Sequence, residues 1–166
     1  MRTVIIGNSG SGKSWLAKHI GERTSTQVIH LDDIFWLPGG FNEKRSPSEV
    51  QNLVNTGKVD TDWIVEGIYG ELANQFLSSA LTLVWLDLPW QVCKQRLEAR
   101  GSESKAHMGR EQSEQGVREL IQWAEAYYSR SGSCSHAAHL CLFESFTGQR
   151  SRFSSEMQVL DYLNAS

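Results

Sequence analysis

Residues 4–14 read Val4-Ile5-Ile6-Gly7-Asn8-Ser9-Gly10-Ser11-Gly12-Lys13-Ser14. The stretch opens on β-branched apolar residues that end at a glycine, which is typical of a strand buried on both faces of a parallel sheet. The next apolar residues, Leu16, Ala17 and Ile20, have helical spacing. We therefore expect a strand, a glycine-rich turn and a helix in succession.

The turn matches the pattern GxxxxGK[ST], in which glycines let successive backbone N–H groups point at one anion. In this pattern Lys13 reaches the β- and γ-phosphates, and the Ser14 hydroxyl binds Mg²⁺. The N-terminus of the following helix adds partial positive charge. The pattern thus predicts a site for a nucleoside triphosphate with Mg²⁺, formed by Gly7, Asn8, Ser9, Gly10, Ser11, Gly12, Lys13, Ser14 and Trp15.

Composition fits one folded domain over residues 1–166, with 40% hydrophobic and 21% charged residues. The net charge of -3 gives no global positive field for nucleic acid or an anionic membrane, so neither is an expected partner. Cys93, Cys134 and Cys141 are odd in number and lack a CxxC, which indicates reduced thiols. No signal peptide and no membrane span is recognisable, and we expect a cytoplasmic protein.

The alternation of strands and helices continues along the chain. We expect further strands at 27–31, 63–66, 81–86 and 139–143, and helices at about 47–56, 69–79, 90–100, 112–129 and 154–164. Such alternation implies right-handed crossovers and an α/β fold, with a parallel sheet covered on both faces. Irregular stretches at 38–40, 101–109 and 129–135 are candidate substrate-covering loops.

Acidic residues follow three of the expected strands. Asp32 is a candidate to orient an acceptor or take its proton, whereas Asp33 serves that role or caps a turn. Glu66 is a candidate to hold Mg²⁺ through water or to position the acceptor. The alternative is that Glu66 has a purely structural role. Asp87 precedes Pro89 and is expected to cap the next helix.

Arginines, aromatics and a Cys/His group add further candidates. Arg96 and Arg100 are four residues apart and lie on one helix face. We expect them either to close over the transferring phosphates or to form a solvated charged surface. Additional arginines are Arg110, Arg118 and Arg130. The aromatics Phe35, Trp36, Phe41, Trp63 and Tyr69 are expected in the core, with stacking on a planar substrate as the alternative. Metal binding is not expected from the spacing of Cys134, His136, His139 and Cys141.

Four segments resemble a known family: GNSGSGKS at 7–14, HLDDIFWLPGGF at 30–41, WIVEGIY at 63–69 and LVWLDLPWQVCKQRLEARG at 83–101. In that order they resemble the adenylate-kinase-related P-loop kinases, and most closely the group labelled DNA topology modulation protein FlaR-like. The resemblance spans nearly the whole chain. It implies a three-layer P-loop NTPase fold with a five-stranded parallel sheet of order 2-3-1-4-5, a short lid at about 101–115, and ATP with Mg²⁺ as phosphoryl donor.

The resemblance also implies residue roles. Lys13 and Ser14 carry over directly, Asp32 takes the place of an acidic residue near the acceptor, and Glu66 that of the acidic residue ending the third strand. Arg96 and Arg100 take the places of lid-proximal arginines. Residues 146–149, after the expected fifth strand, fall where such kinases pass the adenine ring.

The chain departs from the family at three places. Trp15 stands where relatives carry a Thr or Ser that contacts the α-phosphate. Residues 66–69 lack the Asp-Gly-x-Pro-Arg of nucleoside monophosphate kinases, and the lid has no paired cysteines. These departures argue against adenylate kinase activity itself.

The leading hypothesis is a small-molecule kinase that phosphorylates a hydroxyl or phosphate of a modest acceptor, with nucleosides and nucleotides among the candidates. The first alternative is a nucleotide-gated regulatory protein that contacts DNA through a local patch of Arg96, Arg100, Lys105 and Arg110. The second alternative is a slow ATPase. The sequence specifies neither the acceptor nor the oligomeric state.

Overall fold

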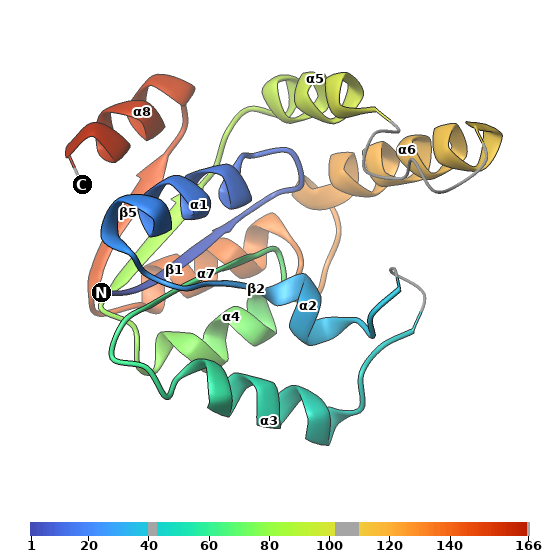
Figure 1. Cartoon of the computed structure of the whole chain (residues 1–166). Coiled ribbons are helices and arrows are strands. Elements are labelled where there is room, and N and C mark those ends of the chain that lie inside the picture. The colour runs from blue at the N-terminus through green and yellow to red at the C-terminus, as the bar shows by residue number, and fades with distance from the viewer. Residues whose placement is uncertain (40–42, 102–109, 166) are drawn as a thin grey trace.

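The computed structural model describes residues 1–39, 43–101 and 110–165. Within them lies one parallel sheet of order β2-β3-β1-β4-β5, as expected. Its strands are β1 (Arg2–Gly7), β2 (Val28–His30), β3 (Trp63–Gly67), β4 (Thr82–Leu86) and β5 (Gln149–Phe153). The glycine-rich turn thus follows the central strand, whose carboxyl end lies between those of β3 and β4 (Figure 1).

The helices cover the sheet on both sides (Figure 1). They are α1 (Lys13–Thr24), α2 (Leu31–Phe35), α3 (Pro47–Gly57), α4 (Gly70–Leu77), α5 (Trp90–Arg100), α6 (Arg110–Glu125), α7 (His136–Ser145) and α8 (Glu156–Ala165), with a 3-10 turn η2 (Ala126–Tyr128) after α6. In the part of the chain that the structure describes, no helix combines the length and apolarity needed to cross a membrane.

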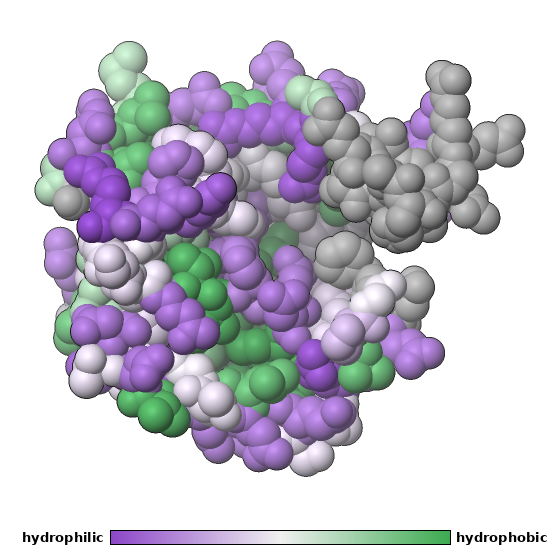
Figure 2. Space-filling view, in the orientation of Figure 1, coloured by the Kyte–Doolittle hydropathy of each residue, from purple (hydrophilic) through white to green (hydrophobic). Residues whose placement is uncertain are grey.

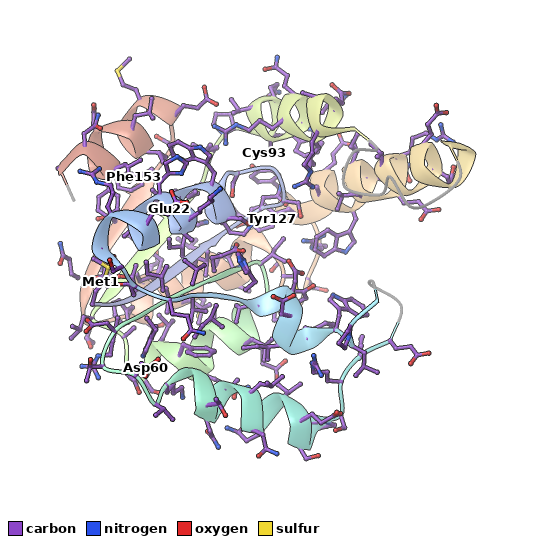
Figure 3. All side chains as sticks on the ribbon, in the orientation of Figure 1. Met1, Glu22, Asp60, Cys93, Tyr127 and Phe153 are labelled. Carbon is purple, nitrogen blue, oxygen red and sulfur yellow. The ribbon has the colours of Figure 1, made fainter. Side chains whose placement is uncertain are left out.

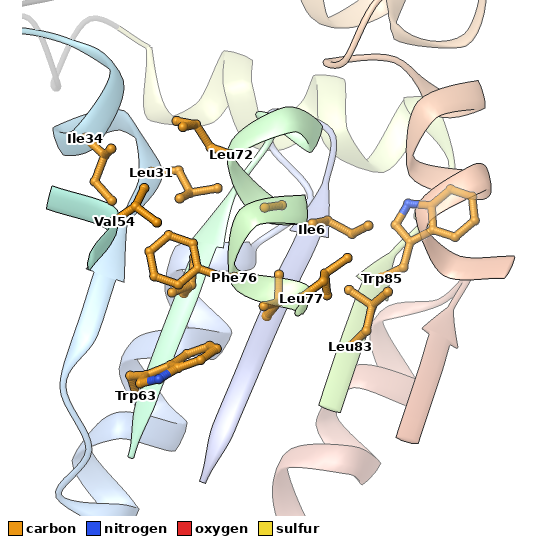
Figure 4. Packing of buried hydrophobic residues seen from close by; sticks show 13 residues of the cluster. Ile6, Leu31, Ile34, Val54, Trp63, Leu72, Phe76, Leu77, Leu83 and Trp85 are labelled. Carbon is orange, nitrogen blue, oxygen red and sulfur yellow. The ribbon is translucent and has the colours of Figure 1, made fainter. Parts of the chain in front are cut away.

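Two hydrophobic clusters hold the three layers together. Alternate residues of β1 face opposite sides, because side chains of a strand alternate. Ile6 belongs to the cluster under α3 and α4, which also contains Trp63 and Phe76 (Figure 4). Ile5 belongs to the cluster under α1 and α8, together with Leu16. The core therefore fixes the position of the turn that follows β1.

On the face shown in Figure 2, hydrophilic residues cover most of the surface, and hydrophobic side chains gather between α2 and α3. This is where the first cluster approaches the surface, through half-buried residues of α2 and α3 such as Phe35 and Val50.

The fifth strand was predicted wrongly. Residues 139–143 are not a strand but lie within helix α7, whose N-cap Ser135 accepts a hydrogen bond from the Ala138 N–H. The true strand, β5, is an edge strand that pairs only with β4 among the described strands. Its sequence Gln-Arg-Ser-Arg-Phe is polar and mostly half-buried or exposed, so it lacks the apolar run that marks a strand in the sheet interior.

Candidate functional site

Two positions in the turn between β1 and α1 require glycine. Gly10 has φ 79° and Gly12 has φ 94°, a left-handed conformation that other residues rarely adopt. A Cβ on Gly10 would lie 2.5 Å from the Cys93 carbonyl oxygen, and one on Gly12 would lie 2.9 Å from Arg96 Nη1. Cys93, which is labelled in Figure 3, lies beside this turn. The loop is thus held tightly against α5.

Lys13 is a nearly buried cation at the start of α1. Lys13 is only 9% exposed, and its Nζ donates a hydrogen bond of 2.9 Å to the Asn8 carbonyl. Burial is the largest influence and lowers the pKa of Lys13, while the charges of Glu66 and Asp32 act in the opposite direction. A buried charge of this kind is compensated by a nearby anion, so the site suits phosphate.

Glu66 lies between a hydroxyl and an imidazole. Its Oε1 accepts hydrogen bonds from Ser14 Oγ at 2.9 Å and from His30 Nδ1 at 2.6 Å. Burial works to raise the pKa of Glu66, but the bonds from His30 and Ser14 together with the charge of Lys13 outweigh it, and the pKa is lowered. Glu66 is therefore an anion. Because the Ser14 hydroxyl donates its proton to Glu66, the lone pairs of its oxygen remain available to a ligand.

His30 was not singled out from the sequence. It lies opposite Glu66 because β2 and β3 are parallel neighbours in a register that pairs these two residues. The hydrogen bond to Glu66 is the largest influence on its pKa, which is raised. The position of His30 at the end of the second strand could have marked it as a site residue. Only the register of β2 and β3 shows that its side chain meets that of Glu66.

Asp32 is held by a short hydrogen-bond chain. The indole N–H of Trp36 donates to Tyr69 Oη at 2.7 Å, and the Tyr69 hydroxyl donates to Asp32 Oδ1 at 2.8 Å. Burial, and then the charge of Asp32, raises the pKa of Tyr69, so the tyrosine remains a donor. Phe35 stacks on Tyr69 with ring centroids 4.5 Å apart. The aromatic residues were expected mainly in the core, and Trp63 lies there, with Phe35 and Tyr69 packed against the core. Trp36 and Tyr69 also orient a carboxylate.

The two arginines of α5 behave differently. Arg96 Nη1 donates to the Ser11 carbonyl at 2.8 Å, and its Nη2 pairs with Glu156 Oε1 at 2.5 Å. Arg96 is thus brought to the glycine-rich loop. Arg100 is exposed at the end of α5, and its charge is one of the influences that lower the pKa of Lys13.

A cavity of about 460 Å³ opens beside the loop. It is lined by Ser11, Gly12, Trp15, Arg96, Glu156, Val159 and Leu160. Trp15 is 44% exposed here, so its indole is available to a ligand in the cavity.

The expected adenine segment, residues 146–149, is not at this cavity. It precedes β5, and the Gln149 N–H donates to the carbonyl of Leu81, which precedes β4. The segment therefore lies at the amino ends of the strands, the edge opposite to the loop after β1, and the prediction for it is wrong. The misplaced fifth strand caused this error, since the residues after the true β5 that line the cavity are Glu156, Val159 and Leu160.

Asp87 does not cap a helix. Helix α5 begins after Pro89, and no side chain caps it. Asp87 instead accepts hydrogen bonds from Arg152, with Nε at 3.0 Å, and pairs with His136 Nε2 at 3.1 Å. The carboxylate thus joins the ends of β4 and β5 to α7.

His139 is part of a buried polar chain, not of a metal site. The Trp85 N–H donates to Tyr127 Oη at 3.2 Å, and the Tyr127 hydroxyl donates to His139 Nδ1 at 2.7 Å. The Nε2–H then donates to the Ile68 carbonyl at 2.9 Å. Burial lowers the pKa of His139 to about 4, so the ring is neutral. Among the described residues no group of three or more Cys, His, Asp and Glu has the arrangement of a metal site.

The remaining candidates lie away from the loop or outside the described residues. Arg118 pairs with Gln115 on the surface of α6, and Arg130 donates to the carbonyls of Trp123 and Cys134. Phe41, Lys105 and the side chain of Arg110 lie outside the part that the structure describes, as does most of the expected lid at 101–115.

Comparisons with known proteins support the fold. No protein-family model and no curated protein matches the chain. Among solved structures, a gluconokinase from Sinorhizobium meliloti 1021 is similar with a TM-score of 0.53 at 14% identity, covering 98% of this chain and 89% of that one. A sugar kinase from Janibacter sp. HTCC2649 is similar with a TM-score of 0.50 at 13% identity, covering 98% and 91%. The α/β fold with sheet order 2-3-1-4-5 matches these P-loop kinase structures.

Proposed function

We propose that this chain is a P-loop small-molecule kinase that transfers the γ-phosphoryl group of ATP, with Mg²⁺, to a small acceptor. The observation that carries the proposal is the convergence of Lys13, Ser14 and Glu66, with Asp32 near enough to act on the charge of Lys13. The kinase-like fold of the similar solved structures supports it. The resemblance to the FlaR-like group rests on the motif segments alone.

The loop residues fit the phosphates of a nucleotide. The left-handed glycines leave the backbone open to an anion, and Lys13 is a buried cation without a carboxylate in hydrogen-bond contact among the described residues. The Ser11 hydroxyl is buried and has no hydrogen-bond partner in the described part of the chain. A phosphate oxygen would satisfy both groups.

Ser14 and Glu66 are the residues suited to hold Mg²⁺. The oxygen of a hydroxyl that donates its proton to a carboxylate is a good ligand for a hard cation, and the carboxylate itself binds the ion directly or through water. When bound, Mg²⁺ would neutralise negative charge on the phosphates.

The cavity beside the loop suits the nucleoside of ATP. Trp15 offers a ring face, Val159 and Leu160 offer apolar surface, and the cavity adjoins the loop that would hold the phosphates. We therefore propose that Trp15 contacts the nucleoside, in place of the α-phosphate contact that a hydroxyl makes in relatives.

Transfer would depend on positioning and charge neutralisation. Lys13 would hold the β- and γ-phosphates, and Arg100 would approach the transferred group from the end of α5. Arg96 would fix the loop through the Ser11 carbonyl. Asp32, held by Tyr69, would orient the acceptor hydroxyl and take its proton.

The test is a screen for ADP formation from Mg-ATP with nucleosides, nucleotides and sugars as acceptors. We expect at least one acceptor to raise ADP formation. Asp32→Asn should lower that rate by about 100-fold or more while ATP affinity is kept, because its role concerns the acceptor. The matched control is Asp33→Asn, at an exposed neighbour whose carboxylate is not proposed to take the acceptor's proton.

Three outcomes contradict the proposal. ADP formation that no acceptor accelerates would indicate a slow ATPase. Salt-dependent DNA binding that requires ATP, with no phosphorylated product, would favour the nucleotide-gated regulatory alternative. Unchanged transfer by Asp32→Asn would remove the role given to this carboxylate.

A further inference from the structure

The part of the site that faces the acceptor is rich in carboxylates. We call the side chains of His30, Asp32, Phe35, Trp36, Glu66 and Tyr69 the acceptor face, because they lie at the carboxyl ends of β2 and β3 and in the segments that follow them. Asp32 and Glu66 are both close enough to Lys13 to raise its pKa. Asp33 adds a third carboxylate one residue further along α2. With Glu66 engaged in holding Mg²⁺, Asp32 and Asp33 still place negative charge on the side where an acceptor would lie.

The described cations near the acceptor face include one over the ring of Phe35 and one bonded to the backbone of Asp33. Lys44 Nζ lies 5.2 Å from the centre of the Phe35 ring, and Arg45 Nε donates to the Asp33 carbonyl at 3.1 Å. His30 donates to Glu66. Recognition of a phosphate or carboxylate requires arginine or lysine groups that point at it, often in pairs. Among the described residues the acceptor face offers no such pair.

The same face offers what a hydroxyl compound needs. Tyr69 donates to Oδ1 of Asp32 and so orients the carboxylate, which has further lone pairs to accept from a hydroxyl. Phe35 and Tyr69 form a stacked pair, and the Trp36 ring packs edge-on against Phe35 at 4.8 Å. Phe35 and Tyr69 are half-buried, which leaves part of their ring surface for an apolar ring face.

We infer that the acceptor is an uncharged compound with a hydroxyl group and an apolar ring face, the chemistry that nucleosides and neutral sugars share, and not a phosphate- or carboxylate-bearing molecule. The inference rests on the proposed kinase function. In the transfer, the acceptor oxygen forms a bond to the γ-phosphorus while the bond from that phosphorus to the β–γ bridging oxygen breaks. Asp32 takes the hydroxyl proton, and ADP leaves with the electron pair.

Matched pairs of acceptors test this inference. Each common nucleoside is compared with its 5′-monophosphate, and glucose and galactose are compared with glucuronate and galacturonate, at equal Mg-ATP. We expect kcat/KM to be about tenfold or more higher for the neutral member of the pair that contains the preferred acceptor. The same set shows whether that acceptor is a nucleoside or a sugar. A charged member that is the better acceptor overturns the inference and leaves the kinase function standing.

Binding of Mg-ATP, measured by calorimetry on the same preparation, separates the two claims. If Mg-ATP binds and neither member of any pair is phosphorylated, the proposed kinase function fails, and the acceptor inferred from it fails as well. If the neutral member of a pair is phosphorylated with the higher kcat/KM, both claims stand.

Variants of the acceptor face provide a second test that does not depend on the rate. Asp32→Asn should reduce the ratio of neutral to charged acceptor affinity by about fivefold or more in competition binding, since it removes a charge that repels anions. Tyr69→Phe, which keeps the ring and frees Asp32, should raise KM for the neutral acceptor more than Phe35→Tyr does. An unchanged affinity ratio in Asp32→Asn, with ATP affinity showing that the variant is folded, overturns the inference.

Discussion

Lys13 combines a nearly buried ammonium group with a carbonyl partner and two carboxylates nearby. We predict that Lys13→Met lowers ATP affinity by about 100-fold or more, because the cation at the β- and γ-phosphates is lost. Thermal stability should be kept or raised, since the fold no longer buries a charge. Calorimetry and thermal unfolding measure the two effects.

Lys18 is the matched control for Lys13. It lies on the same helix, is exposed, and pairs only with Glu22 at 3.8 Å among the described residues. Lys18→Met should therefore leave ATP affinity within about twofold. Equal losses in the two variants would show that the loop does not bind the phosphates through Lys13.

His139 makes stability depend on pH. Its folded pKa of about 4 lies below the ordinary value of 6.5, so the unfolded chain binds the proton more readily between these values. The stability that neutral His139 contributes is therefore complete above about pH 6.5 and is lost as the pH falls toward 4. We predict a loss of about 2 to 3 kcal/mol in unfolding free energy between about pH 7 and pH 4.5 from this residue.

Chemical denaturation of His139→Gln tests this prediction. The variant keeps a polar side chain and removes the titrating group, so its stability should decline less steeply over the same pH interval. Parallel curves for the variant and the wild type would assign the acid sensitivity to other groups.

At the level of single residues, the sequence points to the glycine-rich loop more completely than to the residues around Asp32. Lys13 and Ser14 follow from a contiguous motif whose spacing is set by local backbone geometry. His30 and the link from Tyr69 to Asp32 depend on strand register and on a contact between residues 37 positions apart. Such contacts leave no periodic signal, which is why the sequence did not reveal them.

The secondary structure elements show where local patterns mislead. The stretch His139 to Phe143 alternates apolar and polar residues weakly and was interpreted as a strand, although Ser135 supplies a helix N-cap just before it. The polar strand β5 is paired on one side only, so its ladder hydrogen bonds, and not an apolar run, define it. The central strands β1, β3 and β4 were predicted because both of their faces are buried.

Helix α6 is tied to the glycine-rich loop by one side chain. Asn8 Nδ2 donates to the Ala124 carbonyl near the end of α6 at 2.9 Å, and its Oδ1 accepts from the Ser9 N–H. We predict that Asn8→Ala lowers the unfolding free energy by about 1 to 3 kcal/mol, because two buried or half-buried backbone groups lose their partner. Ser9→Ala is the control and should change it by less than about 0.5 kcal/mol. Equal stability of Asn8→Ala and wild type would contradict the link.

For the whole molecule, strand order explains why residues far apart in the chain form one site. The parallel sheet brings the carboxyl ends of β1, β2 and β3 to the same edge, and with them Lys13, Asp32 and Glu66. The fold class and sheet order were confirmed, because alternating elements and a resemblance that spans nearly the whole chain both constrain them. The cavity beside Trp15 was not predicted, since α8 reaches it from the far end of the chain.

Phosphorus NMR of the wild-type protein with Mg-ATP and the preferred acceptor tests the central claim most directly. Phosphoryl transfer predicts a new phosphomonoester resonance that grows in step with ADP, while inorganic phosphate stays at the level seen without acceptor. ADP that forms together with inorganic phosphate only, or an ATP spectrum that does not change, would contradict the account of this chain as a kinase.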